Sequence, residues 1–268
     1  MPDALHVVLG AYPAATLTVA LLKANLVAAV AILLVAVVRI LARRAFGPAA
    51  AYQLWGLPPA AGLVTLFIEF ARPHTDPAIF AISPAFIWAW AAGALAVAAL
   101  FTVAQLRFLA QVRAGRGGPA VVGFISPVIV MPADDGHYTA EERDLIRAHE
   151  REHVARKDPR GAAFAALAQC LCWFNPVVHL AAYLIRLDQE LACDAAVIRA
   201  RPTARALYAR TLLKTQLAGS ALPLGCHWSP LGQHPLEVRI SSLKRTSNTS
   251  SRASGGTFAA ASVNAIRP

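Results

Sequence analysis

Three long apolar runs dominate the first 110 residues of the chain. They cover residues 14–38, 54–71 and 84–109, and each has the roughly 17–25 residues that a helix needs to cross a bilayer. No basic segment precedes the first run, which is also longer than the apolar core of a signal peptide, so we expect a span and not a cleaved leader. The pattern therefore predicts a transmembrane domain over residues 1–110.

The basic residues at the ends of these runs predict the orientation of the chain. Arginines follow the first run and flank the end of the third, at Arg39, Arg43, Arg44, Arg107, Arg113 and Arg116. Basic residues are enriched in the cytosolic loops of membrane proteins. We therefore expect the N-terminus to lie outside, the first two spans to be joined in the cytosol, and everything after Leu109 to be cytosolic.

Residues 111–245 have a different pattern, and we expect them to form a second domain. Residues 121–132 are rich in Val and Ile and contain two prolines, a composition typical of an edge strand. Such a strand can bind an extended substrate, or the segment can be a hairpin packed on the domain, and the two interpretations are compatible. Helical patterns follow over residues 204–217 and 236–244, and the polar residues 246–268 predict a disordered tail.

A fourth apolar run, residues 162–185, is long enough to span a membrane but contains Asn175-Pro176. A proline removes one hydrogen bond of a helix and favours a break. We expect two apolar helical pieces that dip toward the membrane, or pack in the domain, and then return. The predicted fold class is mainly α: a polytopic membrane protein with about three N-terminal transmembrane helices and a cytosolic domain with a small β element.

The composition agrees with a membrane protein. The chain is 57% hydrophobic and 15% charged, with a mean hydropathy of +0.50, which is more apolar than ordinary soluble domains. Most of the net charge of +10 lies after residue 107. No nucleic-acid recognition motif accompanies this charge, so we expect a domain against an anionic leaflet and no direct nucleic-acid binding. The four cysteines form no C-x-x-C pair, and we expect reduced thiols.

The candidate chemistry begins with His149-Glu150-Arg151-Glu152-His153. Thr139 and Glu142 form a predicted capping box at the start of this helix. Positions i and i+4 share a helix face, so His149 and His153 can hold one Zn²⁺ while Glu150 reaches the attacking water as a base. The alternative interpretation of the motif is a charged turn that faces solvent.

A catalytic zinc needs a third protein ligand, and the segment Asp188–Asp194 offers the best candidate. Glu190 and Asp194 are also an i, i+4 pair. We expect Glu190 to be the third ligand and Asp194 to accept a hydrogen bond from the N–H of a ligand histidine. The alternative is a polar helix face on which Glu190 pairs with Arg186. A shared metal also requires that residues 161–185 do not cross the membrane.

Several linked motifs, in order, resemble the BlaR/MecR-type integral membrane zinc metallopeptidases. The resemblance covers roughly residues 15–245. It rests on four stretches of the sequence: Ser126–Pro132, Tyr138–Asp158, Trp173–His179 and Asp188–Asp194.

This resemblance implies a gluzincin-like zinc metallopeptidase domain with His149, His153 and Glu190 as zinc ligands and Glu150 as the catalytic base. Members of the family are proteins of the bacterial inner membrane. The best-known ones sense β-lactams outside the cell and act on a cytosolic winged-helix repressor. Those sensors carry a further span and a penicillin-binding domain after the peptidase. The sequence here ends in a polar tail without either, so we expect β-lactam sensing to lie outside it.

The resulting hypothesis is a membrane-embedded zinc metalloendopeptidase that cleaves a cytosolic transcriptional repressor or a related regulator, as in an antibiotic response. Two alternatives remain. One is a signalling membrane protein with little or no proteolytic turnover, and the other is a membrane quality-control protease of the HtpX type. The expected partners are the lipid bilayer, the protein substrate, and either a separate sensor or a second copy of the chain.

Overall fold

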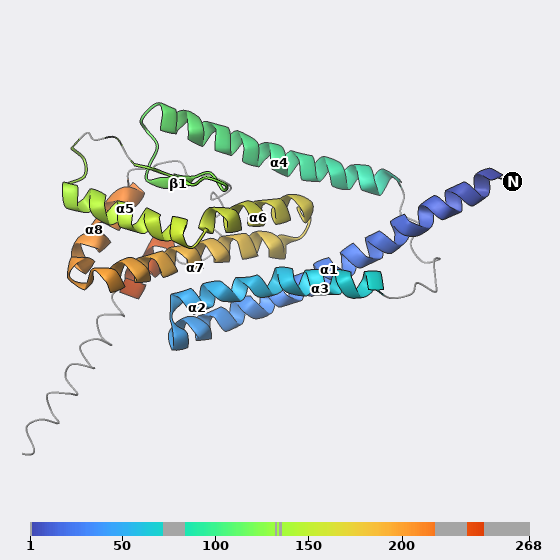
Figure 1. The fold of residues 1–268 in the computed structure, drawn as a ribbon, viewed down its shortest axis with the longest axis horizontal. Helices are drawn as coiled ribbons and strands as arrows, with labels where there is room; N and C mark the ends of the chain where they lie inside the picture. Colours follow the sequence, from blue (N-terminus) through green and yellow to red (C-terminus); the bar gives the residue numbers. More distant parts are fainter. Residues whose placement is uncertain (1, 72–83, 132, 134–135, 218–234, 244–268) are drawn as a thin grey trace, which may run out of the picture.

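The computed structural model describes residues 2–71, 84–131, 133, 136–217 and 235–243 (Figure 1). Within these residues the regular secondary structure is helical apart from one two-stranded sheet. The prediction of a mainly α fold with a small β element is therefore confirmed. The predicted disordered tail, residues 246–268, lies outside the described residues.

Three helical segments of the described chain are long and apolar enough to cross a membrane: Thr18–Phe46, Pro48–Ala71 and Ala85–Arg113. Each overlaps one of the three predicted runs. They correspond to α1 (Pro2–Phe46), to the series α2 (Pro48–Gln53), η1 (Leu54–Gly56) and α3 (Leu57–Ala71), and to α4 (Pro84–Arg113).

The turn between α1 and α2 is made at Gly47. Its φ of 91° lies in the left-handed region that favours glycine. Pro48 follows at the start of α2, where its missing N–H removes no helix hydrogen bond. The chain therefore reverses, and α3 packs along α1. Lys23 of α1 pairs with Glu69 of α3 at 2.8 Å, so the charge within the first apolar run has a partner on the second.

The small β element is an antiparallel hairpin of β1 (Ala120–Val122) and β2 (Val128–Val130), in which Ala120 is opposite Val130. Gly123 turns the chain with a φ of 92°, and a Cβ there would meet the Ser126 carbonyl oxygen at 2.8 Å. Both strands pack on α5. The hairpin interpretation is therefore confirmed, and substrate pairing at its edge stays a prediction.

Helix α5 (Ala140–Ala155) begins with the predicted capping box. The Thr139 hydroxyl accepts from the Glu142 amide at 3.2 Å, and the Glu142 carboxylate accepts from the Thr139 amide at 2.9 Å. Lys157, with a φ of 61°, then separates α5 from α6 (Asp158–Leu171). Asp158-Pro159 begins α6, because proline is tolerated in a first helical turn.

The fourth apolar run turns back, as predicted. Helix α6 ends at Leu171, and α7 (Pro176–Ala200) is capped by Asn175, whose side chain accepts from the Val177 amide at 3.0 Å. Figure 1 shows α6 and α7 as a hairpin between α4 on one side and α1 with α3 on the other. The hairpin tip reaches both neighbours. Asn175 donates to Asn25 of α1 at 2.9 Å, and Trp173 donates to the Trp90 carbonyl of α4 at 3.1 Å.

Two apolar clusters hold these elements together. One joins α1 and η1 to the first half of α7 through Ile32, Val35, Trp55, Val178, Ala181 and Leu184. The other joins α5 to the second half of α7, to α8 (Arg205–Leu217) and to the helical residues 235–243, through Leu145, Val197, Ile198, Tyr208, Leu212 and Leu243. Helix α7 therefore belongs to both clusters.

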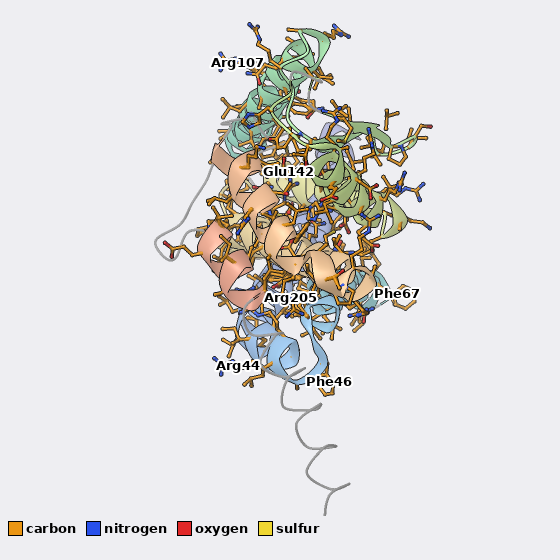
Figure 2. The ribbon with its side chains drawn as sticks, turned by 90° about the vertical axis from the view of Figure 1, so that its left-hand side faces the viewer. Arg44, Phe46, Phe67, Arg107, Glu142 and Arg205 are labelled. Atoms are coloured by element: carbon orange, nitrogen blue, oxygen red, sulfur yellow. The ribbon has the colours of Figure 1, made fainter. Side chains whose placement is uncertain are left out.

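The basic ends of the apolar helices lie toward the end of the molecule that carries α5 and α8. In Figure 2, which views that end, Arg107 of α4 and Arg44 of α1 lie near opposite edges, with Glu142 of α5 between them. The candidate metal motif on α5 is thus on the side of the molecule that positive charge predicts to be cytosolic.

Candidate metal and catalytic site

The three predicted ligands come together in the structure. His149 and His153 lie one turn apart on α5, and their Nε2 atoms are 3.1 Å apart. Glu190 approaches from α7, with Oε2 at 3.2 Å from Nε2 of His149 and Oε1 at 3.7 Å from Nε2 of His153. Both histidines are less than 10% exposed. Two helices that are far apart in sequence therefore present two imidazole nitrogens and one carboxylate to the same point.

The other ring nitrogen of His153 has a buried acceptor. Its Nδ1 lies 2.8 Å from Oδ2 of Asp158, which also accepts from Nη2 of Arg156 at 2.9 Å. A carboxylate at Nδ1 favours the tautomer with the proton on Nδ1, and this leaves the Nε2 lone pair available to a metal. The sequence interpretation assigned Asp158 no role in the site. A carboxylate soon after the second histidine is a signal that could have found it.

The other ring nitrogen of His149 is hydrogen-bonded to a tyrosine. Nδ1 of His149 lies 2.8 Å from the hydroxyl of Tyr208 on α8, and this hydroxyl donates to Oδ1 of Asp194 at 2.7 Å. The direct separation between Nδ1 of His149 and Oδ1 of Asp194 is 3.5 Å. Burial and the charge of Asp194 raise the pKa of Tyr208 well above its usual value, so the phenol keeps its proton. Asp194 thus reaches His149 mainly through Tyr208, a residue the sequence interpretation missed.

Arg239, in the helical residues 235–243, balances the two carboxylates of α7. Its guanidinium donates to both oxygens of Asp194, at 2.8 and 2.7 Å, and lies 3.0 Å from Oε2 of Glu190. Burial alone would raise the pKa of Glu190, but the charges around it, Arg239 foremost, hold that pKa well below its usual value. No spacing in the sequence links Arg239 to this site. The sequence predicts a helix over residues 236–244 but does not indicate which other helix it packs against.

Arg186 also approaches Glu190, with Nε at 3.4 Å from Oε1. The alternative pairing considered from the sequence therefore exists, but it accompanies the contacts between Glu190 and the histidines and does not replace them. A carboxylate has about four lone-pair positions, enough for an arginine and a metal together.

Glu150 is 6% exposed and follows His149 directly on α5. Burial raises the pKa of Glu150 to about 7, against the lowering effect of nearby His153. A carboxyl group with a pKa near neutrality is suited to take up and release a proton at physiological pH. Glu150 therefore lies beside a predicted ligand with a raised pKa, and its role as the base stays a prediction.

Cys193 offers another grouping with the two histidines, in which the ligand atoms lie within 4.8 Å of one another. Its sulfur is 3.4 Å from Nδ1 of His153, the nitrogen that already faces Asp158. Burial raises the pKa of the Cys193 thiol far above its usual value. The set formed by the two Nε2 atoms and Glu190 fits a zinc ion better.

A cleft of about 1460 Å³ lies beside these residues. Its wall is largely apolar and is built by α4, β1, α6 and α7, with Leu100, Phe101, Val122, Ala162 and Ala166 among its residues. His149, Glu150 and Glu190 also line it, so the candidate catalytic groups face a space that can receive a polypeptide segment.

Comparison with known proteins identifies the family. The family described as BlaR1 peptidase M56 matches residues 80–243, a stretch that contains every site residue named above. The chain belongs to this family. The predicted membership of a BlaR/MecR-type peptidase family is therefore confirmed.

One curated relative supports the same assignment. The Regulatory protein BlaR1 of Bacillus licheniformis is 31% identical over 99 residues, which are 35% of this chain and 16% of that protein. The matched part is thus well under two thirds of the relative's length. Together with the three apolar helices, these similarities make the chain a membrane-associated member of a peptidase family.

Proposed function

We propose that this chain is a zinc-dependent endopeptidase of the bacterial inner membrane whose site faces the cytosol and cleaves a cytosolic regulator. The observation that carries the proposal is the convergence of Glu190 with the Nε2 atoms of His149 and His153. Two imidazoles and one carboxylate are a ligand set that zinc takes in peptidases.

His149, His153 and Glu190 would hold the zinc ion, and Asp158 and Tyr208 keep the two imidazole rings in place. When bound, zinc supplies Lewis acidity toward the scissile carbonyl and the attacking water. Glu150 takes the proton from that water and delivers it to the leaving amine. Its pKa of about 7 allows both transfers. Arg239 places a positive charge beside Asp194 and Glu190, and this charge helps to hold the pKa of Glu190 well below its usual value.

Two observations support the substrate class that we propose. The basic ends of the apolar helices favour a cytosolic site. The Bacillus licheniformis relative is named a regulatory protein. A cytosolic transcriptional regulator, such as a winged-helix repressor, is therefore the substrate that we propose.

Metal analysis tests the ligand set. Purified protein in detergent should contain about one equivalent of zinc, and His153→Ala should lose most of it because a coordination bond is removed. His137→Ala is the matched control, since His137 is exposed and lies outside the site. Unchanged zinc content in both His153→Ala and Glu190→Ala would refute the site.

Comparison of protein levels in cells tests the substrate. Cells that carry Glu150→Gln in place of the wild-type protein should accumulate one intact cytosolic regulator that the wild type degrades. Accumulation of many unrelated unfolded proteins would instead indicate quality control. An unchanged set of proteins under every inducing condition would indicate a signalling protein without turnover.

A further inference from the structure

The segment that joins the first two apolar helices packs beside the candidate site. We call residues 48–56 the connector; it consists of α2 and η1. It packs on α7, the helix that carries Glu190. The metal chemistry proposed above uses no residue of the connector or of α1, yet side chains from both reach the supports of the candidate ligands.

On the Glu190 side, the connection is through Asp188. This carboxylate is 0% exposed. It accepts from Nη1 of Arg39 on α1 at 2.9 Å and from Nε1 of Trp55 in the connector at 2.8 Å. Each oxygen of Asp188 thus has its own donor, and both donors come from the first 56 residues of the chain.

Helix geometry connects the hydrogen bonds of Asp188 to the position of the candidate ligand Glu190. Consecutive residues of an α-helix are rotated by about 100°, so Asp188 and Glu190 point to nearly opposite sides of α7. Arg39 and Trp55 hold the side that faces α1 and the connector, and they thereby fix the rotation of α7. The same rotation aims Glu190 at the two histidines of α5.

On the His153 side, the connection is through Tyr52. The guanidinium of Arg156 stacks over the Tyr52 ring at 4.8 Å from its centroid. Nη2 of Arg156 donates to Asp158, the residue at Nδ1 of His153. The Tyr52 hydroxyl also accepts from Nε2 of Gln189 at 3.1 Å. Tyr52 therefore contacts both helices of the site at once.

We propose that Arg39, Tyr52 and Trp55 are positioning residues, which act through Asp188, Gln189 and Arg156 to set the distance and rotation of α5 and α7 that the metal requires. The inference rests on the proposed function for the identity of the metal. The geometry of the site is thus set by the membrane part of the chain, and the peptidase helices alone do not determine it.

The test measures metal affinity in the full chain, in lipid nanodiscs. Asp188→Asn removes the negative charge to which Arg39 and Trp55 donate, and it keeps the shape of the side chain. We expect its zinc dissociation constant, measured by competition with a chelator, to rise about tenfold or more, as for other residues that orient metal ligands. Cobalt-substituted protein should show a changed visible absorption spectrum, because the ligand geometry around the ion changes.

Asp144→Asn is the matched control. Asp144 lies on α5 and pairs with Arg201, but its side chain is 49% exposed and it is not among the residues that line the cleft. This variant should keep the zinc affinity and the cobalt spectrum of the wild type. A general effect of breaking an Asp–Arg pair between elements would appear in both variants, whereas a positioning effect appears only in Asp188→Asn.

Three further variants decide the matter if Asp188→Asn does not fold. Tyr52→Phe keeps the aromatic ring and loses only the hydroxyl, and it should still weaken zinc binding. Arg39→Met should weaken zinc binding, and Arg39→Lys should restore part of the affinity because the charge returns. Folded variants at positions 39, 52 and 188 that all match the wild type in zinc affinity and cobalt spectrum would overturn the proposal.

The two proposals can fail separately. If the wild type binds zinc but cleaves no protein, the proposed function fails, and the zinc affinities of the variants still test the positioning role. If the wild type cleaves its substrate and the variants keep normal zinc affinity, only the positioning role fails.

Discussion

The two halves of α7 are held in place by different forces. The first half, up to Leu187, packs with α1 and η1 through an apolar cluster that includes Val178, Ala181 and Leu184. The second half also packs in an apolar cluster, through Val197 and Ile198, but it carries in addition the buried polar residues Asp188, Gln189 and Asp194. Near the hairpin tip α7 is thus held mainly by apolar packing, and near the candidate site it is held by apolar packing together with buried polar contacts.

This difference predicts that substitutions in the two halves of α7 affect stability and the candidate site to different extents. An apolar contact is non-directional, and its loss leaves a cavity whose cost depends on how well the neighbours relax. A buried charge pair is directional, and loss of one partner leaves the other charge uncompensated. Substitutions in the first half of α7 should therefore lower stability with little effect on the site. Substitutions in the second half should affect both.

The largest effect on activity is expected from Glu150→Gln. The amide is nearly isosteric but cannot accept the proton of the attacking water, so hydrolysis should fall by about 10²–10⁴-fold while zinc content stays the same. Glu152→Gln on the same helix should keep its activity, because Glu152 is not among the residues that line the cleft. Substantial cleavage by purified Glu150→Gln would place the base elsewhere.

The next largest effect is expected from Arg239→Met. This variant leaves Asp194 and Glu190 without their shared cation, which should cost about 3–5 kcal/mol of stability. It should also weaken zinc binding, since both carboxylates support the site. Unfolding by denaturant in detergent and chelator competition measure the two effects.

Leu184→Ala is the control from the apolar half of α7. Truncation of this buried leucine should cost about 2–5 kcal/mol of stability through the cavity it leaves, with an unchanged zinc affinity in the protein that remains folded. Equal losses of zinc affinity in Arg239→Met and Leu184→Ala would mean that the two halves of α7 are not distinct.

Local patterns in the sequence predict much of this architecture. Hydrophobic runs predict the three long helices, the Thr139–Glu142 box predicts the start of α5, and Asn175-Pro176 predicts the turn between α6 and α7. These features depend on residues close together in the chain. The i, i+4 pairs on α5 and α7 likewise indicate which residues share a helix face. The candidate ligands could therefore be named before the structure was known.

Contacts between distant elements could not be read in this way. Tyr208, Arg239 and Asp188 have no local signal, because their roles depend on how α7, α8 and the helical residues 235–243 pack on α5 and α1. Asp194 shows the same limit: its placement beside the site follows from spacing, but the hydroxyl between it and His149 does not. Three-dimensional packing decides which polar side chain fills a buried gap.

The smallest effect on zinc binding is expected from removal of the Tyr208 hydroxyl, which lies between His149 and Asp194. Tyr208→Phe keeps the buried ring and removes the group between His149 Nδ1 and Asp194, so the imidazole loses its acceptor. Zinc affinity should fall about tenfold, as expected when the support of a metal-bound histidine is removed. Tyr138→Phe, at another buried tyrosine, should leave zinc affinity unchanged. In the wild type, Oδ1 of Asp194 lies 3.5 Å from Nδ1 of His149. If Tyr208→Phe also binds zinc normally, Asp194 must move closer and accept from His149 directly, which is the arrangement expected from the i, i+4 spacing alone.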